Sequence, residues 1–174
     1  MSTGLASRRV LRHALPIALI SAVAIIALDQ ASKYLVVEQM NLRETGEIHV
    51  FPGLDFRMAW NTGVNFGLLA GGGDTTRYII AGGTLLVALF LLLASIASRR
   101  TSAALGFGIA AGGAIGNSID RLNWGAVADF LNVSCCGIRN PWSFNIADIA
   151  VFAGFALLLI PRSWREPSSS QAPG

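Results

Sequence analysis

Residues 103–119 read AALGFGIAAGGAIGNSI, an apolar stretch rich in glycine and alanine. A helix needs about 20 mostly apolar residues to cross the hydrocarbon core of a membrane. Small residues let neighbouring helix backbones approach closely in lipid. The stretch therefore predicts a membrane-spanning helix that packs tightly against other helices. The polar side chains at its end, Asn117 and Asp120, should face protein or a water-filled cleft rather than lipid.

The composition of the whole chain agrees with a membrane protein. The 174 residues are 53% hydrophobic and 13% charged, and the mean hydropathy is +0.56. Soluble domains carry about a quarter charged residues. The length suits a single domain, which we expect to cover residues 1–166, followed by a Pro/Ser-rich, disordered tail at 167–174. The net charge of +3, without a basic stripe interleaved with aromatics, argues against a nucleic-acid partner.

Three further apolar stretches predict membrane spans, at about residues 11–28, 78–97 and 146–160. The last is short, so we expect its first turn to lie at the membrane interface. The first follows several arginines and could be mistaken for a cleaved signal peptide. No small-x-small cleavage site followed by a polar mature domain is present, so we interpret it as a retained helix.

Three basic clusters set the expected orientation of the four spans. They comprise Arg8, Arg9 and Arg12, then Arg99 and Arg100, and finally Arg162 and Arg165. An even number of spans puts all three clusters on one face, which the positive-inside rule assigns to the cytoplasm. Both termini are then cytoplasmic, and every acidic residue except Glu166 lies at or toward the opposite, outer face.

Two segments between the spans should lie on that outer face. In residues 34–76, the apolar–polar alternation from Leu54 to Met58 predicts a short strand. Pro52 and Gly53 predict a turn before it, and a small sheet resting on the membrane surface is plausible. Residues 121–144 form the second outer segment, which we interpret as a loop.

Two aspartates are candidates for catalysis. Asp129 lies in GAVADF (125–130), and Asp148 lies in FNIADIA (144–150). An ionisable side chain within or beside a membrane span is costly, which makes it a candidate functional residue. Two close carboxylates would share a proton. The ionised one can take a proton from water while the protonated one donates to a carbonyl, which is aspartic peptidase chemistry without a metal or a covalent intermediate.

Structural roles remain open for both aspartates. Asp129 could be a loop acid that caps a helix or pairs with Arg121 or Arg139. Asp148 could cap the last span, where the helix dipole favours an anion. A transporter or channel would need ionisable groups along the span centres, which the sequence lacks. A scaffold protein would leave the two outer aspartates without a purpose.

Other candidate sites are weaker. Residues 71–74 (GGGD) match the G-x-G-D string of presenilin-type proteases, but Asp74 is most simply an N-cap. Ser32 and Lys33 are sequence neighbours, which does not make a Ser–Lys nucleophile. Asp29 and Lys33 lie one helical turn apart and can form an ion pair.

The cysteines and histidines do not form a recognisable metal-binding or redox motif. Cys135 and Cys136 are adjacent, which leaves a vicinal disulfide or two small loop side chains as interpretations. His13 and His49 are far apart, and no zinc-protease motif occurs.

Five short blocks carry a family resemblance. In order they are DQASK (29–33), NTGVNFG (61–67), GGAIGNSIDR (112–121), VADF (127–130) and FNIAD (144–148). Together, and over about residues 22–160, they resemble the lipoprotein signal peptidases (signal peptidase II), a family of aspartic peptidases of the bacterial inner membrane.

The resemblance implies a mainly α membrane protein. Four transmembrane helices would carry a small periplasmic β-cradle and an outer loop or helix that covers the site. It implies that Asp129 and Asp148 form the catalytic dyad. Supporting or substrate-binding roles would fall to Asp29, Lys33, Asn61, Gly63, Asn117, Asp120, Arg121 and Asn145. Helix capping is an alternative role for Asn145.

The implied substrate is a prolipoprotein that already carries diacylglycerol on its lipobox cysteine. Cleavage would fall just before that cysteine, without a cofactor, at a site facing the periplasm. An apolar groove between spans could hold the acyl chains beside membrane lipid. The chain departs from the family pattern at Val64 and Asn65, where two small residues are common, and at Ala128, where Val or Ile is more common.

Overall fold

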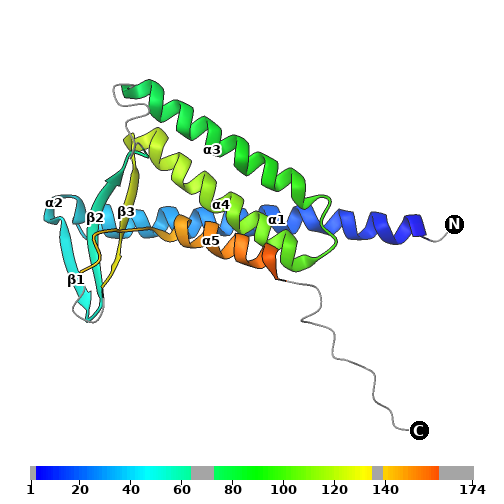
Figure 1. Ribbon diagram of the computed structural model, residues 1–174, viewed down its shortest axis with the longest axis horizontal. Helices are drawn as coiled ribbons and strands as arrows, with labels where there is room; N and C mark the ends of the chain where they lie inside the picture. Colours follow the sequence, from blue (N-terminus) through cyan, green and yellow to red (C-terminus); the bar gives the residue numbers. More distant parts are fainter. Residues whose placement is uncertain (1–2, 64–72, 135–138, 161–174) are drawn as a thin grey trace, which may run out of the picture.

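A computed structural model describes residues 3–63, 73–134 and 139–160 of the chain, and most of them are helical (Figure 1). The elements in chain order are α1 (Thr3–Lys33), the π-helix η1 (Tyr34–Gln39), α2 (Leu42–Thr45), β1 (Glu47–Phe51), β2 (Leu54–Asn61), α3 (Gly73–Ser95), α4 (Thr101–Trp124), β3 (Val127–Val133) and α5 (Ile146–Leu159). Figure 1 shows the strands at one end of the helices, with the α3–α4 turn and the start of α1 at the other end.

Helix α4 packs tightly against its neighbours, as its small residues predict. A Cβ atom at Gly112 would lie 2.7 Å from the carbonyl oxygen of Ala22 on α1. A Cβ atom at Gly113 would overlap the carbonyl oxygen of Ala147 on α5. The glycines therefore let α4 contact the backbones of two helices at once, and those two helices carry candidate site residues.

Three of the four predicted spans are long and apolar enough to cross a membrane, in α1, α3 and α4. Helices α1 and α4 extend beyond the predicted ends of their apolar stretches, because the polar residues there are buried within the protein. Asp29, Lys33 and Asp120 are all 0% exposed. The fourth predicted span is the apolar helix α5, whose 14 residues extend about 21 Å at 1.5 Å per residue. That is shorter than a full crossing requires.

The predicted strand and turn are confirmed. Strands β1, β2 and β3 form an antiparallel sheet in that order, and β2 extends the predicted strand to Asn61. Gly53 in the β1–β2 turn has φ +96°, a conformation that favours glycine. The sheet packs on η1 and α2 through a small apolar core that contains Val37, Leu42 and Phe130.

The interpretation of residues 121–144 as a loop is wrong in part. Residues 127–133 form β3, which pairs with β2 so that Asp129 lies opposite Ala59. The run VADFLNV is buried over most of its length, so it lacks the clear exposed-and-buried alternation that reveals a surface strand. The departures at Val64 and Asn65, the Cys135–Cys136 pair and the expected tail at 167–174 lie outside the described residues.

We expect Gly112→Ala to destabilise the protein, because its new Cβ must push α1 away from α4. Overpacking costs about 1–3 kcal/mol, which corresponds to a melting temperature lower by roughly 3–10 °C for a chain of this size. The melting temperature is measured by tryptophan fluorescence in detergent. The matched control is Gly82→Ala, whose Cβ would meet nothing within 4 Å. Equal melting temperatures for the two variants would contradict the packing role of α4.

Candidate active site

Asp129 and Asp148 come from different elements and meet at the junction of sheet and helices. Asp129 lies on β3 and is 4% exposed. Asp148 lies in the first turn of α5, half-buried. Asn145 precedes that helix as its N-cap. Its side-chain Oδ1 accepts from the Asp148 amide at 2.9 Å, and its own amide donates to Asp148 Oδ2 at 3.2 Å. This capping box begins the helix and orients the Asp148 carboxylate.

Asn145 also binds the other carboxylate. Its Nδ2 donates to Asp129 Oδ1 at 2.6 Å, and it is itself 0% exposed. One buried asparagine therefore contacts both aspartates, through its side chain to Asp129 and through its backbone and side chain to Asp148. The predicted alternative for Asn145, helix capping, is correct and coexists with a place beside both acids.

Asn117 of α4 forms a second bridge. Its Nδ2 donates to Asp148 Oδ1 at 2.9 Å. Its Oδ1 accepts from Asn145 Nδ2 at 3.1 Å and from Lys33 Nζ at 3.4 Å. The Asn117 oxygen is thus held by Asn145 and Lys33, while its nitrogen is directed toward Asp148.

Strand β2 supplies a third amide. Asn61 Nδ2 donates to Asp129 Oδ2 at 3.1 Å, and its Oδ1 accepts from the backbone of Gly63 at 2.9 Å. Gly63 has φ +76°, and a Cβ there would lie 3.5 Å from Nη2 of Arg121. The positive φ would strain a side chain at this position, and its Cβ would lie 3.3 Å from Cδ1 of Ile80, closer than to the arginine.

Arg121 lies close enough to Asp129 and Asp148 to interact with their charges. Its Nη1 donates to the carbonyl oxygen of Asn117 at 3.2 Å. Its buried Nε has no hydrogen-bond partner among the residues that the structure describes. The guanidinium thus places a positive charge near the two carboxylates.

The predicted Asp29–Lys33 pair is confirmed and belongs to a larger buried cluster. Lys33 Nζ lies 2.7 Å from Asp29 Oδ2 and 2.6 Å from Asp120 Oδ2. The sequence interpretation missed Gln30, whose Nε2 donates to Asp120 Oδ1 at 2.9 Å and to Asp29 Oδ2 at 3.1 Å. Its position within the DQASK block was the available signal. We call Asp29, Gln30, Lys33 and Asp120 the ionic cluster.

The pKa of Asp129 is raised from its ordinary value to about 6. Burial is the main cause, because it disfavours the charged form, and the negative charge of Asp148 acts in the same direction. Hydrogen bonds from Asn61 and Asn145, and then the charge of Lys33, oppose the shift. Asp129 therefore holds a proton at a higher pH than an ordinary aspartate does.

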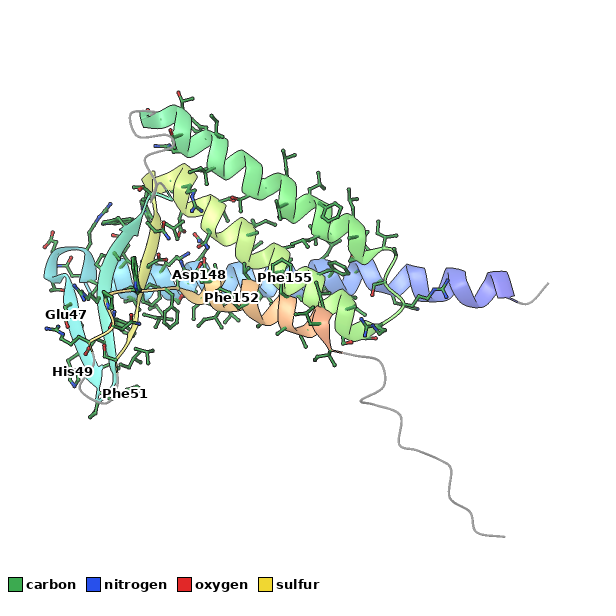
Figure 2. All side chains as sticks on the ribbon, viewed as in Figure 1. Glu47, His49, Phe51, Asp148, Phe152 and Phe155 are labelled. Carbon is green, nitrogen blue, oxygen red and sulfur yellow. The ribbon has the colours of Figure 1, made fainter. Side chains whose placement is uncertain are left out.

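An apolar groove runs from Asp148 along the exposed face of α5. It has a volume of about 580 Å³, and its lining residues are Phe144, Asp148, Ile149, Phe152, Ala153 and Ala156. Figure 2 shows Phe152 and Phe155 beyond Asp148 along this helix. The carboxylate of Asp148 thus lies at the polar end of a groove suited to hydrocarbon.

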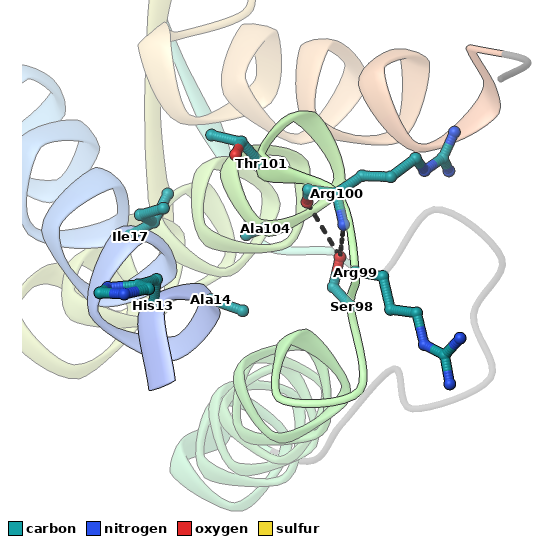
Figure 3. Close-up of a pocket in the computed structure, with 8 residues that line it drawn as sticks. All are labelled: His13, Ala14, Ile17, Ser98, Arg99, Arg100, Thr101 and Ala104. Carbon is teal, nitrogen blue, oxygen red and sulfur yellow. Dashed lines mark hydrogen bonds between the residues drawn. The ribbon is translucent and has the colours of Figure 1, made fainter. Parts of the chain in front are cut away.

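A second cavity, of about 220 Å³, lies at the opposite end of the bundle, between α1 and the α3–α4 turn (Figure 3). It is lined by His13, Arg99 and Arg100 together with small or apolar residues, and among the described residues no carboxylate lines it. The arginine side chains extend away from the hollow in Figure 3, and Arg100 donates to the carbonyl oxygen of Ile160 at 2.9 Å.

Several residues considered from the sequence lie elsewhere. Asp74 is not an N-cap, because α3 begins at Gly73 and Asp74 contacts Arg77 at 3.3 Å within the first turn. Arg139 lies 3.3 Å from Glu47 and does not pair with Asp129. Ser32 Oγ donates to its own helix, at the carbonyl oxygen of Asp29. Within residues 3–63, 73–134 and 139–160, no three His, Cys, Asp or Glu side chains converge to hold a metal ion.

Comparisons with known proteins agree on one family. The family model described as signal peptidase (SPase) II, Peptidase_A8, matches residues 21–163. The chain is 38% identical to a lipoprotein signal peptidase of Rhodopseudomonas palustris (strain TIE-1), over 81% of this chain and 88% of the relative. It is 36% identical to one of a Nostoc species, over 83% and 88%.

A solved structure described as a bacterial membrane enzyme is similar to most of this chain. Its TM-score is 0.67 at 29% sequence identity, covering 81% of this chain and 88% of that chain. Its likeness and the apolar helices establish this chain as a bacterial membrane protein.

We expect Asp129 to titrate near pH 6 in the folded protein, where carboxyl NMR or infrared difference spectra can follow it. Asp148→Asn should lower the pKa of Asp129, because it removes a like charge. Asn61→Ala should raise that pKa, because it removes a donor that stabilises the carboxylate. An Asp129 that titrates near pH 4 and ignores both substitutions would contradict the geometry.

Proposed function

The chain belongs to the signal peptidase II family, whose members are aspartic peptidases that remove signal peptides from prolipoproteins, and we propose that Asp129 and Asp148 are its catalytic dyad. The observation that supports this assignment is the shared partner Asn145. Its Nδ2 lies 2.6 Å from Asp129 while its amide lies 3.2 Å from Asp148. Helix capping alone would not require the hydrogen bond from Asn145 Nδ2 to Asp129.

The pair would share one proton, held mainly by Asp129. Asp148 accepts hydrogen bonds from Asn117 and from the Asn145 amide and lies at the N-terminus of α5, the positive end of the helix dipole. Asp129 is nearly fully buried, and its raised pKa favours the protonated form.

Each carboxyl group then has its own role in the reaction. The Asp148 carboxylate takes a proton from a water molecule, whose oxygen attacks the scissile carbonyl carbon. The Asp129 carboxyl donates its proton to the carbonyl oxygen, giving a tetrahedral diol. Collapse of the diol breaks the C–N bond, and the proton held by Asp148 passes to the leaving amine. Asp129 recovers its proton from the diol, so the dyad returns to its starting state.

The supporting residues have distinct parts in this proposal. Asn61, Asn117 and Asn145 orient the carboxylates with uncharged amides. Arg121 lies close enough to both carboxylates to interact with their charges, so it would hold a positive charge beside the dyad. Gly63 adopts a positive φ that favours glycine, and its amide donates to Asn61.

The groove along α5 suggests the substrate class. Acyl chains of a diacylglyceryl-modified cysteine would lie against Ile149 and Phe152, which places the bond just before that cysteine near Asp148. Each methylene transferred from water to an apolar surface contributes about 0.8 kcal/mol. The lipid would therefore supply much of the binding free energy and fix the register of the peptide.

The charges at the two ends of the bundle support an orientation. Arg99 and Arg100 lie at the α3–α4 turn, whereas the dyad lies at the sheet end. We assign the arginine end and both termini to the cytoplasm. The dyad and the sheet would then face the periplasm at the surface of the inner membrane, where exported prolipoproteins are accessible.

We expect Asp129→Asn and Asp148→Asn each to lower kcat by about 10⁴-fold or more, because neither leaves a complete acid–base pair. Cleavage of a diacylglyceryl-modified precursor peptide in liposomes measures it, and a chelator should leave the wild-type rate unchanged. Asp55→Asn is the control, since Asp55 pairs with His49 on the hairpin. Wild-type rates for either dyad variant would refute the assignment.

We also expect Ala153→Trp to raise KM for the diacylglyceryl substrate on the order of tenfold, equivalent to about 1.4 kcal/mol, because the indole fills the groove. Leu86→Trp, on the exposed face of α3, serves as the matched control and should leave KM unchanged. A groove variant with the KM of the control would show that the acyl chains bind elsewhere.

A further inference from the structure

The ionic cluster takes no chemical step in cleavage, yet it buries three charges. Asp29, Lys33 and Asp120 have side chains that are 0% exposed. Removing charges from water costs several kcal/mol per ion, and apolar residues of similar volume often stabilise a fold as well. Stability alone is therefore a weak reason for such a cluster.

Each acid of the cluster binds the backbone immediately before one member of the dyad. Asp120 Oδ2 accepts from the amide of Ala128, at 3.3 Å, and Ala128 precedes Asp129. Asp29 Oδ1 accepts from the amide of Ala147, at 3.0 Å, and Ala147 precedes Asp148. The two contacts fix β3 and the first turn of α5 relative to the same ammonium group, that of Lys33.

Lys33 also reaches the dyad through Asn117. An ammonium group only donates hydrogen bonds, so the Asn117 oxygen must face it. That orientation leaves Nδ2 directed at Asp148, where it donates at 2.9 Å. Reversing the amide would put donors against Lys33 and an oxygen against the carboxylate.

The packing around the cluster preserves these distances. A Cβ atom at Gly116 would lie 2.7 Å from Asp29 Oδ2, so the absence of a side chain there lets α1 and α4 approach. Gln30 joins the two acids with one amide group, at 2.9 and 3.1 Å. The carboxylate oxygens are thus held by several donors and cannot move without breaking more than one contact.

We propose that Asp29, Lys33 and Asp120 are positioning residues that hold the two catalytic carboxylates at their working separation, by binding the backbone amides of Ala147 and Ala128 around one shared ammonium. This role rests on the proposed function of Asp129 and Asp148. The cluster itself contacts neither the substrate nor the reacting atoms.

The test uses variants of Asp29 and Asp120 that keep the negative charge but move the carboxylate oxygen that accepts the backbone hydrogen bond. Asp29→Glu and Asp120→Glu retain the ion pair with Lys33, while the extra methylene displaces the acceptor from the amide of Ala147 or Ala128. The isosteric variants Asp29→Asn and Asp120→Asn are a second pair, for use where the longer side chain prevents folding. Ser32→Ala is the control, because Ser32 lies on the same helix and its hydroxyl donates to the backbone carbonyl of Asp29 rather than to a carboxylate of the ionic cluster.

Full-length proteins are reconstituted, and rates on a diacylglyceryl-modified precursor peptide are normalised to the folded fraction at a temperature well below every melting transition. We expect kcat per folded molecule to fall on the order of 10²-fold, while KM stays at the wild-type value. A role only in stability would lower the melting temperature and leave kcat per folded molecule unchanged.

The proposal is overturned if the folded cluster variants show wild-type kcat, or if they lose efficiency through KM alone. The dyad variants in the same assay separate the two claims. Inactive Asp129→Asn and Asp148→Asn beside fully active cluster variants would leave the dyad standing and remove the positioning role. Active dyad variants would refute the proposed function itself.

Discussion

The ammonium group of Lys33, buried between the carboxylates of Asp29 and Asp120, is the interaction on which the arrangement of the site depends. It lies where α1, α4, β3 and the start of α5 converge, and each of these elements contributes a contact to it or to its two acids. Because an unpaired charge is very costly in such a place, all three charges must be present together. The tight packing of α4 on α1 through Gly112 and Gly116 brings them into range.

Outward from the ionic cluster, charged side chains give way to uncharged amides and then to the two aspartates. Next to it lie uncharged amides, Asn117 and Asn145, which hydrogen-bond the two aspartates without adding charge. Asp129 is nearly inaccessible to water and has a raised pKa, whereas Asp148 is half-buried at the mouth of an apolar groove. The two carboxylates therefore differ in environment although they are chemically identical, and acid–base catalysis by a pair requires such a difference.

Much of this arrangement was predictable from the sequence, because helices in lipid leave strong hydropathy signals. The apolar stretches located α1, α3 and α4, and the cost of a charge near a span singled out Asp129 and Asp148. The ends of α1 and α4 were predicted too short, since hydropathy cannot reveal that Lys33 pairs with both Asp29 and Asp120 in the interior. Strand β3 was interpreted as a loop. Its seven residues are mostly buried, so they lack the alternation of apolar and polar side chains that marks a strand at a surface. The contacts to Ala128 and Ala147 involve backbone amides, which no side-chain pattern encodes.

An experimental structure with a bound inhibitor would test directly whether Asp129 and Asp148 form the catalytic dyad. The inhibitor is a lipopeptide whose scissile carbonyl is replaced by a hydroxyl-bearing tetrahedral carbon. That group imitates the diol, which a dyad should bind more tightly than it binds substrate. We expect the hydroxyl to lie about 3 Å from carboxylate oxygens of both Asp129 and Asp148, with the acyl chains along Ile149 and Phe152. A hydroxyl bound by other side chains, with the two aspartates out of hydrogen-bonding reach, would contradict the dyad assignment.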